Sequence, residues 1–300
     1  MNHALRLTLL ILPLLATGAA GGNELQVALL QSSTASQAST SARWVGLNSK
    51  QLKLRSKSAL VLDHDGNQIY GKATDEPRPI ASITKLMTAM VILDSPLPMQ
   101  EKLQITKQDR DLLRLTGSRL KYGAMLTREQ LLRLALMSSE NRAAAALART
   151  FPAGRKAFIH AMNQKAKTLG MTSSHFVGPT GLDAGNVASA RDLAKLAHAA
   201  MAYPLIREAT TTRSVEVRPY RKRGPLRYGN TNRLLKNKAW NIGLSKTGYI
   251  NEAGRCLVMQ VRIAGEPMVI VLLDSFGKLT PYGDSNRIRK WIEKGAKGST

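Results

Sequence analysis

The stretch RCLVMQVRIAGEPMVIVLLD, at positions 255–274, gives the clearest indication of the fold. It contains two apolar runs separated by Ala264, Gly265 and Glu266, and the first run alternates apolar with polar residues. This pattern predicts two antiparallel β-strands joined by a short loop. Cys256, the one cysteine of the chain, lies in the first run, so we expect it in the core and not in an internal disulfide.

A matching strand signal lies near the other end of the chain. In SALVLDHDGNQIYGK, at positions 58–72, apolar residues flank a D-G-N turn, which predicts a β-hairpin that pairs 59–62 with 68–70. The residues between these two strand regions have helical patterns instead. The order therefore predicts an α/β fold of the α+β type, with an antiparallel sheet built from both chain ends and an inserted helical lobe.

The helical middle has recognisable start and stop residues. Thr127 with Gln130 forms a capping-box pattern before an apolar run. The segment ENRAAAALART is rich in alanine, Gly170 ends the next apolar segment, and Ser189 is a candidate N-cap for RDLAKLAHAAMA. A last amphipathic helix is predicted for SNRIRKWIEKGAK, after the strand pair.

The first 20 residues have the pattern of a secretory signal peptide. Arg6 precedes an apolar run at 7–16 that is too short to span a bilayer, and small residues at 18–20 suit a cleavage site. A retained N-terminal anchor is the alternative. We expect an exported, soluble mature protein without a transmembrane anchor, in which a flexible Ser/Thr-rich leader at 21–45 precedes one folded domain at 46–296.

The chain is strongly basic, with 44 Lys and Arg against 20 Asp and Glu and a formal net charge of +24. Such a surface favours anionic partners, but export makes nucleic acid an unexpected one. The basic segment 218–230, RPYRKRGPLRYGN, is either a wall-binding face or a solvated surface. The five histidines show no metal-ligand spacing, so we expect no metal site.

The segment RPIASITKLMTAMVILD, at 78–94, places a lysine in an apolar helix. Residues three apart are neighbours on a helix, so Lys85 can reach Ser82. A serine hydroxyl needs a base to become a nucleophile, and burial lowers the pKa of a lysine so that it can act as that base. The same spacing occurs at Ser118 and at Ser275, but neither of these serines begins a sustained apolar helix.

Two further motifs complement this pair. Ser139-Glu140-Asn141 joins two helical segments, where the serine hydroxyl could relay a proton and the Asn141 amide could hold a substrate carbonyl. The alternative interpretation of this motif is a pair of serines that caps a helix. Lys246-Thr247-Gly248 lies just before the predicted strand pair, where Lys246 and Thr247 could bind a carboxylate and Gly248 could admit a substrate backbone. Its alternative is an ordinary strand entry with a turn glycine.

In this order the three motifs match the signature of penicillin-binding proteins and related β-lactamases. Over residues 58–292 the chain resembles the low-molecular-mass penicillin-binding proteins, serine peptidases that act on D-alanyl-D-alanine. The segments GPTGLDAGNVASARDLAKLA at 178–197, NTNRLL at 230–235 and KTGYINEAG at 246–254 extend the resemblance. It is greatest to the D-alanyl-D-alanine endopeptidase branch, the penicillin-binding protein 7 type.

The resemblance implies a β-lactamase/transpeptidase-like fold at 46–296, no cofactor, and a periplasmic enzyme that cleaves peptidoglycan cross-links and is inhibited by β-lactams. It implies Ser82 as nucleophile and Lys85 as general base, with Ser139 and Lys246 as a proton relay. The implied substrate-binding residues are Asn141, Thr247, Gly248 and Tyr249; the backbone N–H groups of Ser82 and Tyr249 are the implied oxyanion hole.

Three other functions remain open at this stage. A D-alanyl-D-alanine carboxypeptidase would use the same residues. A class A β-lactamase needs a glutamate for deacylation, and neither Glu208 nor Glu216 lies in the expected Glu-x-x-Leu-Asn context. A non-catalytic wall-binding protein on an inactive scaffold is the third alternative, and the three intact motifs argue against it.

Overall fold

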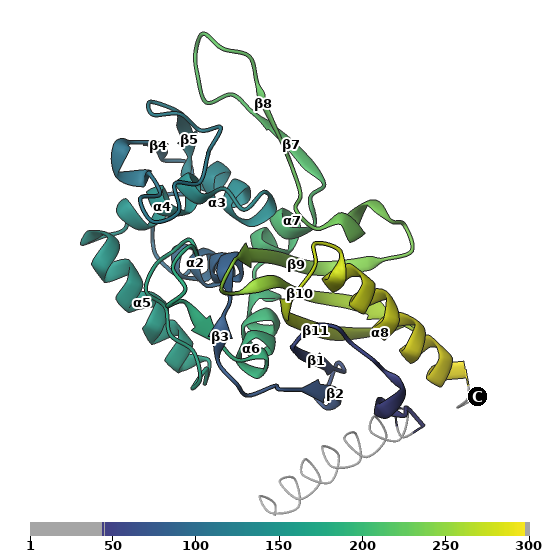
Figure 1. Cartoon of the computed structure of the whole chain (residues 1–300). Helices are drawn as coiled ribbons and strands as arrows, with labels where there is room; N and C mark the ends of the chain where they lie inside the picture. Colours follow the sequence, from purple (N-terminus) through teal and green to yellow (C-terminus); the bar gives the residue numbers. More distant parts are fainter. Residues whose placement is uncertain (1–43, 45, 298–300) are drawn as a thin grey trace, which may run out of the picture. The chain divides into compact units, whose positions relative to one another are not determined.

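The computed structural model describes Trp44 and residues 46–297. The predicted signal peptide at 1–20 and, apart from Trp44, the predicted leader at 21–45 lie outside the described residues. The described part contains a five-stranded antiparallel sheet in the order β2-β1-β11-β10-β9 (Figure 1). Its strands are β1 (Ser58–Leu62), β2 (Gln68–Lys72), β9 (Asn241–Ile250), β10 (Gly254–Ile263) and β11 (Glu266–Ser275).

The sheet confirms that both chain ends contribute to it, because β1 pairs directly with β11. The predicted hairpin is also confirmed, with Val61 opposite Tyr70 and Leu62 opposite Gln68. The turn between β10 and β11 is one residue shorter than predicted, since Glu266 already belongs to β11. Ala264 and Gly265 alone make this turn, with φ of 50° and 84°, which is the backbone conformation of a type I′ hairpin.

A helical lobe lies between the two halves of the sheet in the sequence, as predicted. Its helices are α2 (Thr84–Leu93), α3 (Arg128–Met137), α4 (Asn141–Arg149), α5 (Gly154–Thr168), α6 (Ala190–Ala200) and α7 (Pro204–Thr211); α8 (Thr280–Lys297) follows the sheet. The capping box at Thr127 and the Ser189 cap are present, the latter accepting from the Asp192 N–H at 3.1 Å. Within this described region no helix has the length and apolar character needed to cross a bilayer.

Short elements connect the helices and strands. The 3₁₀ helices are η1 (Ser49–Gln51), η2 (Ala81–Ile83), η3 (Lys107–Asp109) and η4 (Arg233–Lys236). Three two-stranded ladders pair β3 (Arg78–Pro79) with β6 (Val187–Ala188), β4 (Lys102–Gln104) with β5 (Met125–Thr127), and β7 (Ser214–Val217) with β8 (Leu226–Gly229). The β7–β8 hairpin projects from the molecule and includes most of the basic segment 218–230 (Figure 1).

Both faces of the sheet are buried, so alternate strand residues enter two different cores. Leu60, Val258 and Val271 face the helical lobe, whereas Val61 and Met259 face α8 and its Ile288 and Ile292. This partition is the expected result of a period of two along each strand.

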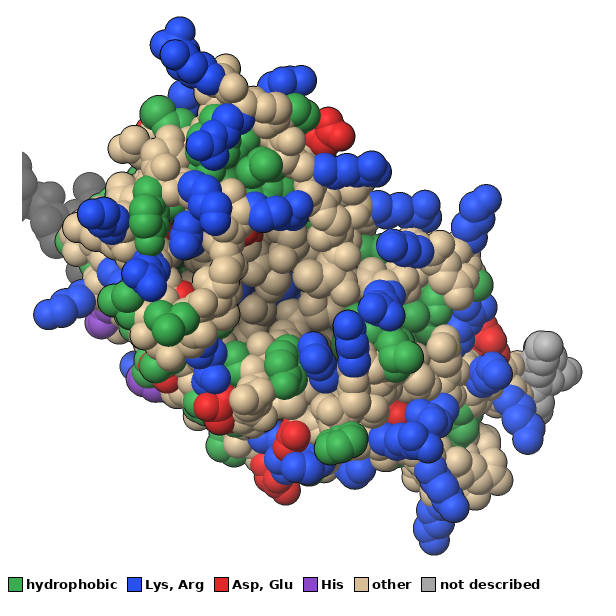
Figure 2. Space-filling view, turned by 45° about the horizontal axis from the view of Figure 1, so that its top comes forward, with side chains coloured by type: hydrophobic (Ala, Val, Ile, Leu, Met, Phe, Trp, Pro, Cys, Tyr) green, Lys and Arg blue, Asp and Glu red, His purple; other side chains and the backbone are tan. Residues whose placement is uncertain are grey.

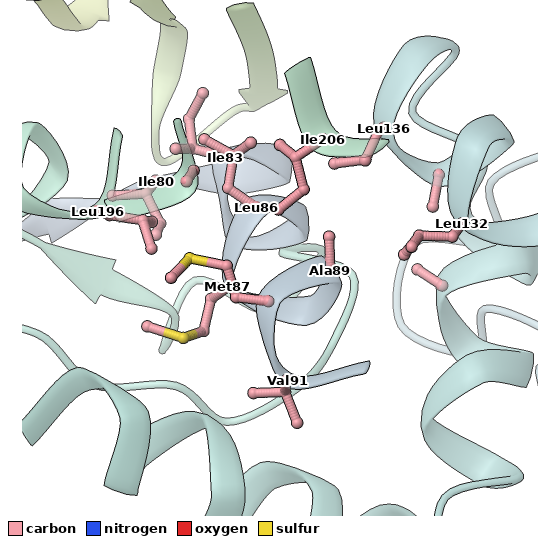
Figure 3. Close-up of a cluster of buried hydrophobic side chains, with 14 of the residues drawn as sticks. Ile80, Ile83, Leu86, Met87, Ala89, Val91, Leu132, Leu136, Leu196 and Ile206 are labelled. Carbon is pink, nitrogen blue, oxygen red and sulfur yellow. The ribbon is translucent and has the colours of Figure 1, made fainter. Parts of the chain in front are cut away.

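Helix α2 is the centre of the larger core. Its residues from Thr84 to Ile92 are all buried, and Leu86 and Met87 point into different apolar neighbours in Figure 3. A helix that is apolar around its whole circumference must be enclosed on every side. The element that follows Ser82 is therefore one of the most firmly packed in the fold, and it fixes the position of the side chains at its N-terminus.

Candidate active site

Ser82 lies at the head of the apolar helix, as predicted, in the 3₁₀ turn η2 that leads directly into α2. The residue before it, Ala81, has a φ of 48°, and its carbonyl accepts a hydrogen bond from Thr84 Oγ1 at 2.8 Å. Gly181 lies against this turn, where a Cβ would be 1.9 Å from the Ala81 oxygen. The turn therefore depends on a glycine from a distant segment, and it leaves Ser82 half-buried at a cavity.

Lys85 is fully buried and reaches Ser82, as predicted. Its Nζ lies 2.9 Å from Ser82 Oγ, 2.8 Å from Asn141 Oδ1 and 2.6 Å from the Thr180 carbonyl oxygen. Burial lowers the pKa of Lys85 to about 7, and the charge of Glu140 opposes this decrease. A neutral amine can donate to Asn141 and Thr180, which leaves its lone pair for the Ser82 hydroxyl proton.

A second serine–lysine pair faces the first. Ser139 has a φ of 61° and lies between α3 and α4, and its Oγ is 2.8 Å from the Nζ of Lys246. Lys246 is 1% exposed and also donates to the Thr247 carbonyl at 2.9 Å. Burial, and next the nearby charge of Lys85, hold the pKa of Lys246 well below its usual range. Two buried lysines whose pKa values are lowered in this way can exchange protons with neighbouring hydroxyls near neutral pH.

Lys246-Thr247-Gly248 directly precedes the strand pair β10–β11, as predicted. The motif lies within a further strand, β9, and so is not the strand entry of the alternative interpretation. A Cβ on Gly248 would be 2.8 Å from the Ile80 carbonyl oxygen and 3.0 Å from the Ser82 nitrogen, so β9 passes directly beside η2. Tyr249 follows with its side chain 47% exposed. The motif therefore forms a wall of the site beside Ser82.

The predicted binding residues are held by threonines that lie outside the three motifs. Asn141, the first residue of α4, donates from Nδ2 to Thr116 Oγ1 at 3.1 Å. Thr247 Oγ1 lies 2.6 Å from Thr231 Oγ1. Thr180 and Thr231 fall inside segments that carry the family resemblance, which could have identified them, whereas Thr116 has no signal in the sequence.

These groups line a cavity of about 410 Å³. Its lining includes Ser82, Ser139, Asn141, Thr247, Gly248 and Tyr249, and no Asp or Glu side chain. Glu208 is on α7, paired with Arg133 at 2.8 Å, and Glu216 is on β7, so neither can serve as the deacylating glutamate of a class A β-lactamase. Among residues 44 and 46–297, no group of three or more His, Cys, Asp or Glu side chains is arranged to hold a metal ion.

Cys256 also lies at this cavity, but it is 2% exposed and its Sγ lies 3.4 Å from the Ala253 carbonyl. Burial raises its pKa to about 12. A thiol with such a pKa is not a nucleophile at neutral pH. Cys256 is a buried strand residue, as predicted.

Comparison with known proteins gives a consistent result. The family model described as D-alanyl-D-alanine carboxypeptidase matches residues 46–277. A D-alanyl-D-alanine endopeptidase of Pseudomonas aeruginosa is 49% identical over 246 residues, which are 82% of this chain and 79% of that protein. A D-alanyl-D-alanine endopeptidase of Escherichia coli is 48% identical over 246 residues, again 82% of this chain and 79% of that protein.

Solved structures agree in the fold. The Streptomyces DD-transpeptidase matches with a TM-score of 0.74 and 29% identity, over 80% of this chain and 97% of that one. A D-alanyl-D-alanine carboxypeptidase from Mycobacterium tuberculosis matches with a TM-score of 0.72 and 28% identity, over 80% of this chain and 91% of that one. The chain belongs to the D-alanyl-D-alanine carboxypeptidase family and is a serine peptidase of the penicillin-binding fold.

Proposed function

We propose that this protein is a peptidoglycan D,D-endopeptidase that hydrolyses D-alanyl cross-links through an acyl-enzyme on Ser82. The observation that carries the proposal is the 2.9 Å contact between Ser82 Oγ and the buried Nζ of Lys85. A lysine with a pKa of about 7 is available as a base at neutral pH, where an ordinary lysine is not. The relatives named D-alanyl-D-alanine endopeptidase support the cross-link as substrate.

In the proposed acylation, Lys85 Nζ accepts the hydroxyl proton as Ser82 Oγ bonds to the carbonyl carbon of a D-alanine. The tetrahedral oxyanion is stabilised by the backbone N–H groups of Ser82 and Tyr249. A proton passes through Ser139 and Lys246 to the leaving amine, and the C–N bond breaks. Water then attacks the ester carbonyl carbon, and the bond between that carbon and Ser82 Oγ breaks. The acyl group leaves as a carboxylate, and Ser82 Oγ regains its proton.

The remaining residues hold the substrate. Asn141 binds the acyl carbonyl, Thr247 binds the carboxylate beside the scissile bond, and Gly248 allows the substrate backbone to lie along β9. A β-lactam presents a similar carbonyl and carboxylate to the same groups, so it acylates Ser82 and leaves slowly. A slowly released acyl group on Ser82 would inhibit the enzyme.

The proposed enzyme acts outside the cytoplasm. Residues 1–20 serve as the signal peptide, 21–45 as a leader and 46–296 as the catalytic domain. Cross-linked peptides of the wall are then within its reach in the periplasm. The basic segment 218–230 is either a contact for the wall or a solvated surface.

One digestion separates the proposed activity from its closest alternative. Purified protein is incubated in parallel with cross-linked muropeptide dimers and with monomeric pentapeptides, and the products are separated by chromatography. Cleavage of dimers without release of terminal D-alanine supports an endopeptidase. Release of terminal D-alanine alone identifies a carboxypeptidase, an activity named in more distant relatives. Cleavage of neither substrate contradicts both.

A matched pair of variants tests the nucleophile. Ser82→Ala is expected to abolish both cleavage and covalent labelling by a fluorescent penicillin. Ser118→Ala changes the serine of another Ser-x-x-Lys, whose Oγ accepts from the Leu120 N–H at 3.0 Å outside the cavity, and is expected to retain both. Labelling that persists in Ser82→Ala places the nucleophile elsewhere.

A further inference from the structure

One part of the cavity lining, here called the compartment, is cationic. It is formed by Arg233 of η4, Arg255 of β10, Lys278, and Pro281 and Tyr282 at the start of α8. Thr247 and Tyr249 share one face of β9, and Arg255 is directly opposite Tyr249 on β10. The compartment therefore adjoins the side of Thr247 that receives the leaving group in the proposed reaction.

The cations of this compartment have no carboxylate to neutralise them. Within the described part of the chain, no ion pair joins Arg233, Arg255 or Lys278 to an acidic side chain. Glu252, on the turn between β9 and β10, is instead paired with Arg114 at 2.8 Å. Figure 2 shows a face that is hollowed near its middle, where Lys and Arg side chains predominate around the hollow. Arg233 and Lys278 are exposed and Arg255 is half-buried. Cations gathered at a concave surface favour an anionic ligand.

Arg255 is held in a fixed position although it has no acidic partner. Its guanidinium stacks over the ring of Tyr249, 3.6 Å from the ring centroid. A stacked guanidinium retains its edge N–H groups for a planar anion, which makes arginine well suited to bidentate binding of carboxylates.

Arg233 reaches the same compartment from the other side. It follows Thr231, whose carbonyl accepts a hydrogen bond from the Tyr282 hydroxyl at 3.2 Å. Burial raises the pKa of Tyr282, and the charges of Arg233 and Arg255 oppose that increase. Both guanidinium charges therefore act on one phenol that lines the same cavity.

We infer that Arg233 and Arg255 bind a second carboxylate on the leaving half of the substrate, beyond the carboxylate that Thr247 contacts. The inference rests on the proposed function. A leaving D-alanine has one carboxylate and would leave this compartment unfilled. The leaving half of a cross-link is itself a peptide, and an amino acid with a distal carboxylate can place it between the two arginines. The compartment thus selects an acidic acyl acceptor over a simple terminal residue.

Two synthetic substrates isolate this interaction. One is an N-acyl-D-alanyl-D-2-aminopimelate, with a free distal carboxylate, and the other is its distal amide. The measured quantity is the ratio of their kcat/KM values, which does not depend on the active fraction of a preparation. The wild-type protein is expected to prefer the acid about tenfold at low salt, as for one charge-assisted hydrogen bond. The preference is expected to decrease in 0.5 M salt, because added ions screen the attraction between the distal carboxylate and the two arginines.

The variants identify the residues. Arg255→Gln and Arg233→Gln are each expected to reduce the ratio to below threefold. Arg255→Lys, which keeps the charge but loses the planar pair of N–H donors, is expected to give a ratio between those of Arg255→Gln and the wild type. Arg262→Gln is the matched control, because Arg262 lies on the same strand and donates to the Gly265 carbonyl at 2.6 Å, outside the cavity. It is expected to keep the wild-type ratio.

The outcomes separate this inference from the proposed function. A wild-type ratio within twofold of one, with both substrates hydrolysed, overturns the inference and leaves the proposed function intact. An equal loss of preference in Arg262→Gln overturns it too. Hydrolysis of neither substrate overturns the proposed function and the inference with it.

Discussion

The pKa of Lys85 makes a quantitative prediction about the pH dependence of acylation. Burial lowers this pKa from 10.5 to about 7, so Lys85 is about 9% neutral at pH 6 and about 91% neutral at pH 8. If neutral Lys85 is the base, the rate of acylation rises about tenfold between these two values and levels off above pH 8. An ordinary lysine would give a rise of about a hundredfold with no plateau, because it stays almost fully charged throughout.

The assay is the second-order rate constant for labelling of Ser82 by a fluorescent penicillin, measured by rapid quench at constant ionic strength. Labelling of the Ser82 peptide is verified by mass spectrometry. A rate that is constant from pH 6 to pH 8, or one that still rises tenfold per unit at pH 9, would refute the assignment of Lys85 as a base with a pKa near 7.

Two variants serve as internal checks. Glu140→Gln removes a charge that raises the pKa of Lys85. The rise of the labelling rate with pH, the acid limb of the profile, therefore moves to lower pH. The amide retains an oxygen for the Arg142 N–H, which Glu140 caps at 3.1 Å, so the helix start is preserved. Lys85→Arg is expected to show no labelling at any of these pH values, because arginine does not lose its proton. A shift of the limb to higher pH in Glu140→Gln contradicts the electrostatic argument.

Three further substitutions or treatments test separate parts of the site. Gly181→Ala places a Cβ 1.9 Å from the Ala81 oxygen at a φ of 74°, so we expect a loss of about 3 kcal/mol or more in the free energy of unfolding, measured by urea denaturation; near-native stability would contradict the close approach. Cys256, with a pKa of about 12, should react with a thiol reagent only after denaturation, and rapid reaction of the native protein would contradict its burial. Thr231→Val removes the 2.6 Å contact to Thr247, so kcat/KM for dimers should fall about tenfold while Thr231→Ser stays near wild type; equal losses in both would point to packing instead.

Four of the five strands of the central sheet could be predicted, because apolar runs and turn residues mark them in the sequence. These are β10 and β11 and the two strands of the β1–β2 hairpin. Strand β9 was missed over most of its length. Its lobe-facing positions read Leu244, Lys246, Gly248 and Ile250, so a lysine and a glycine interrupt the apolar face. Lys246 and Gly248, which obscure the strand pattern, are the same residues that form the site beside Ser82.

The candidate site could be predicted only where its members form short motifs. The Ser82–Lys85 contact follows from helical spacing, and the structure brings the pair together at 2.9 Å. The contact of Thr116 with Asn141 joins positions 25 residues apart, and a single threonine in a loop has no spacing pattern that would reveal it. Thr231 could be identified only through the family resemblance of its segment. The 3₁₀ form of η2 was also missed, because it depends on Gly181 from another loop and not on the residues around Ser82.

The direct pairing of β1 with β11 has a consequence for biosynthesis. The sheet that holds Lys246 cannot close until a chain segment more than two hundred residues after β1 has been made, and such long-range pairing is slow to form. A nascent or truncated polypeptide can contain Ser82 and Lys85, yet it lacks the strand that completes their surroundings. Hydrolytic activity is thereby tied to completion of the whole catalytic domain, which keeps unfinished molecules from cutting the polymer that maintains the shape of the cell.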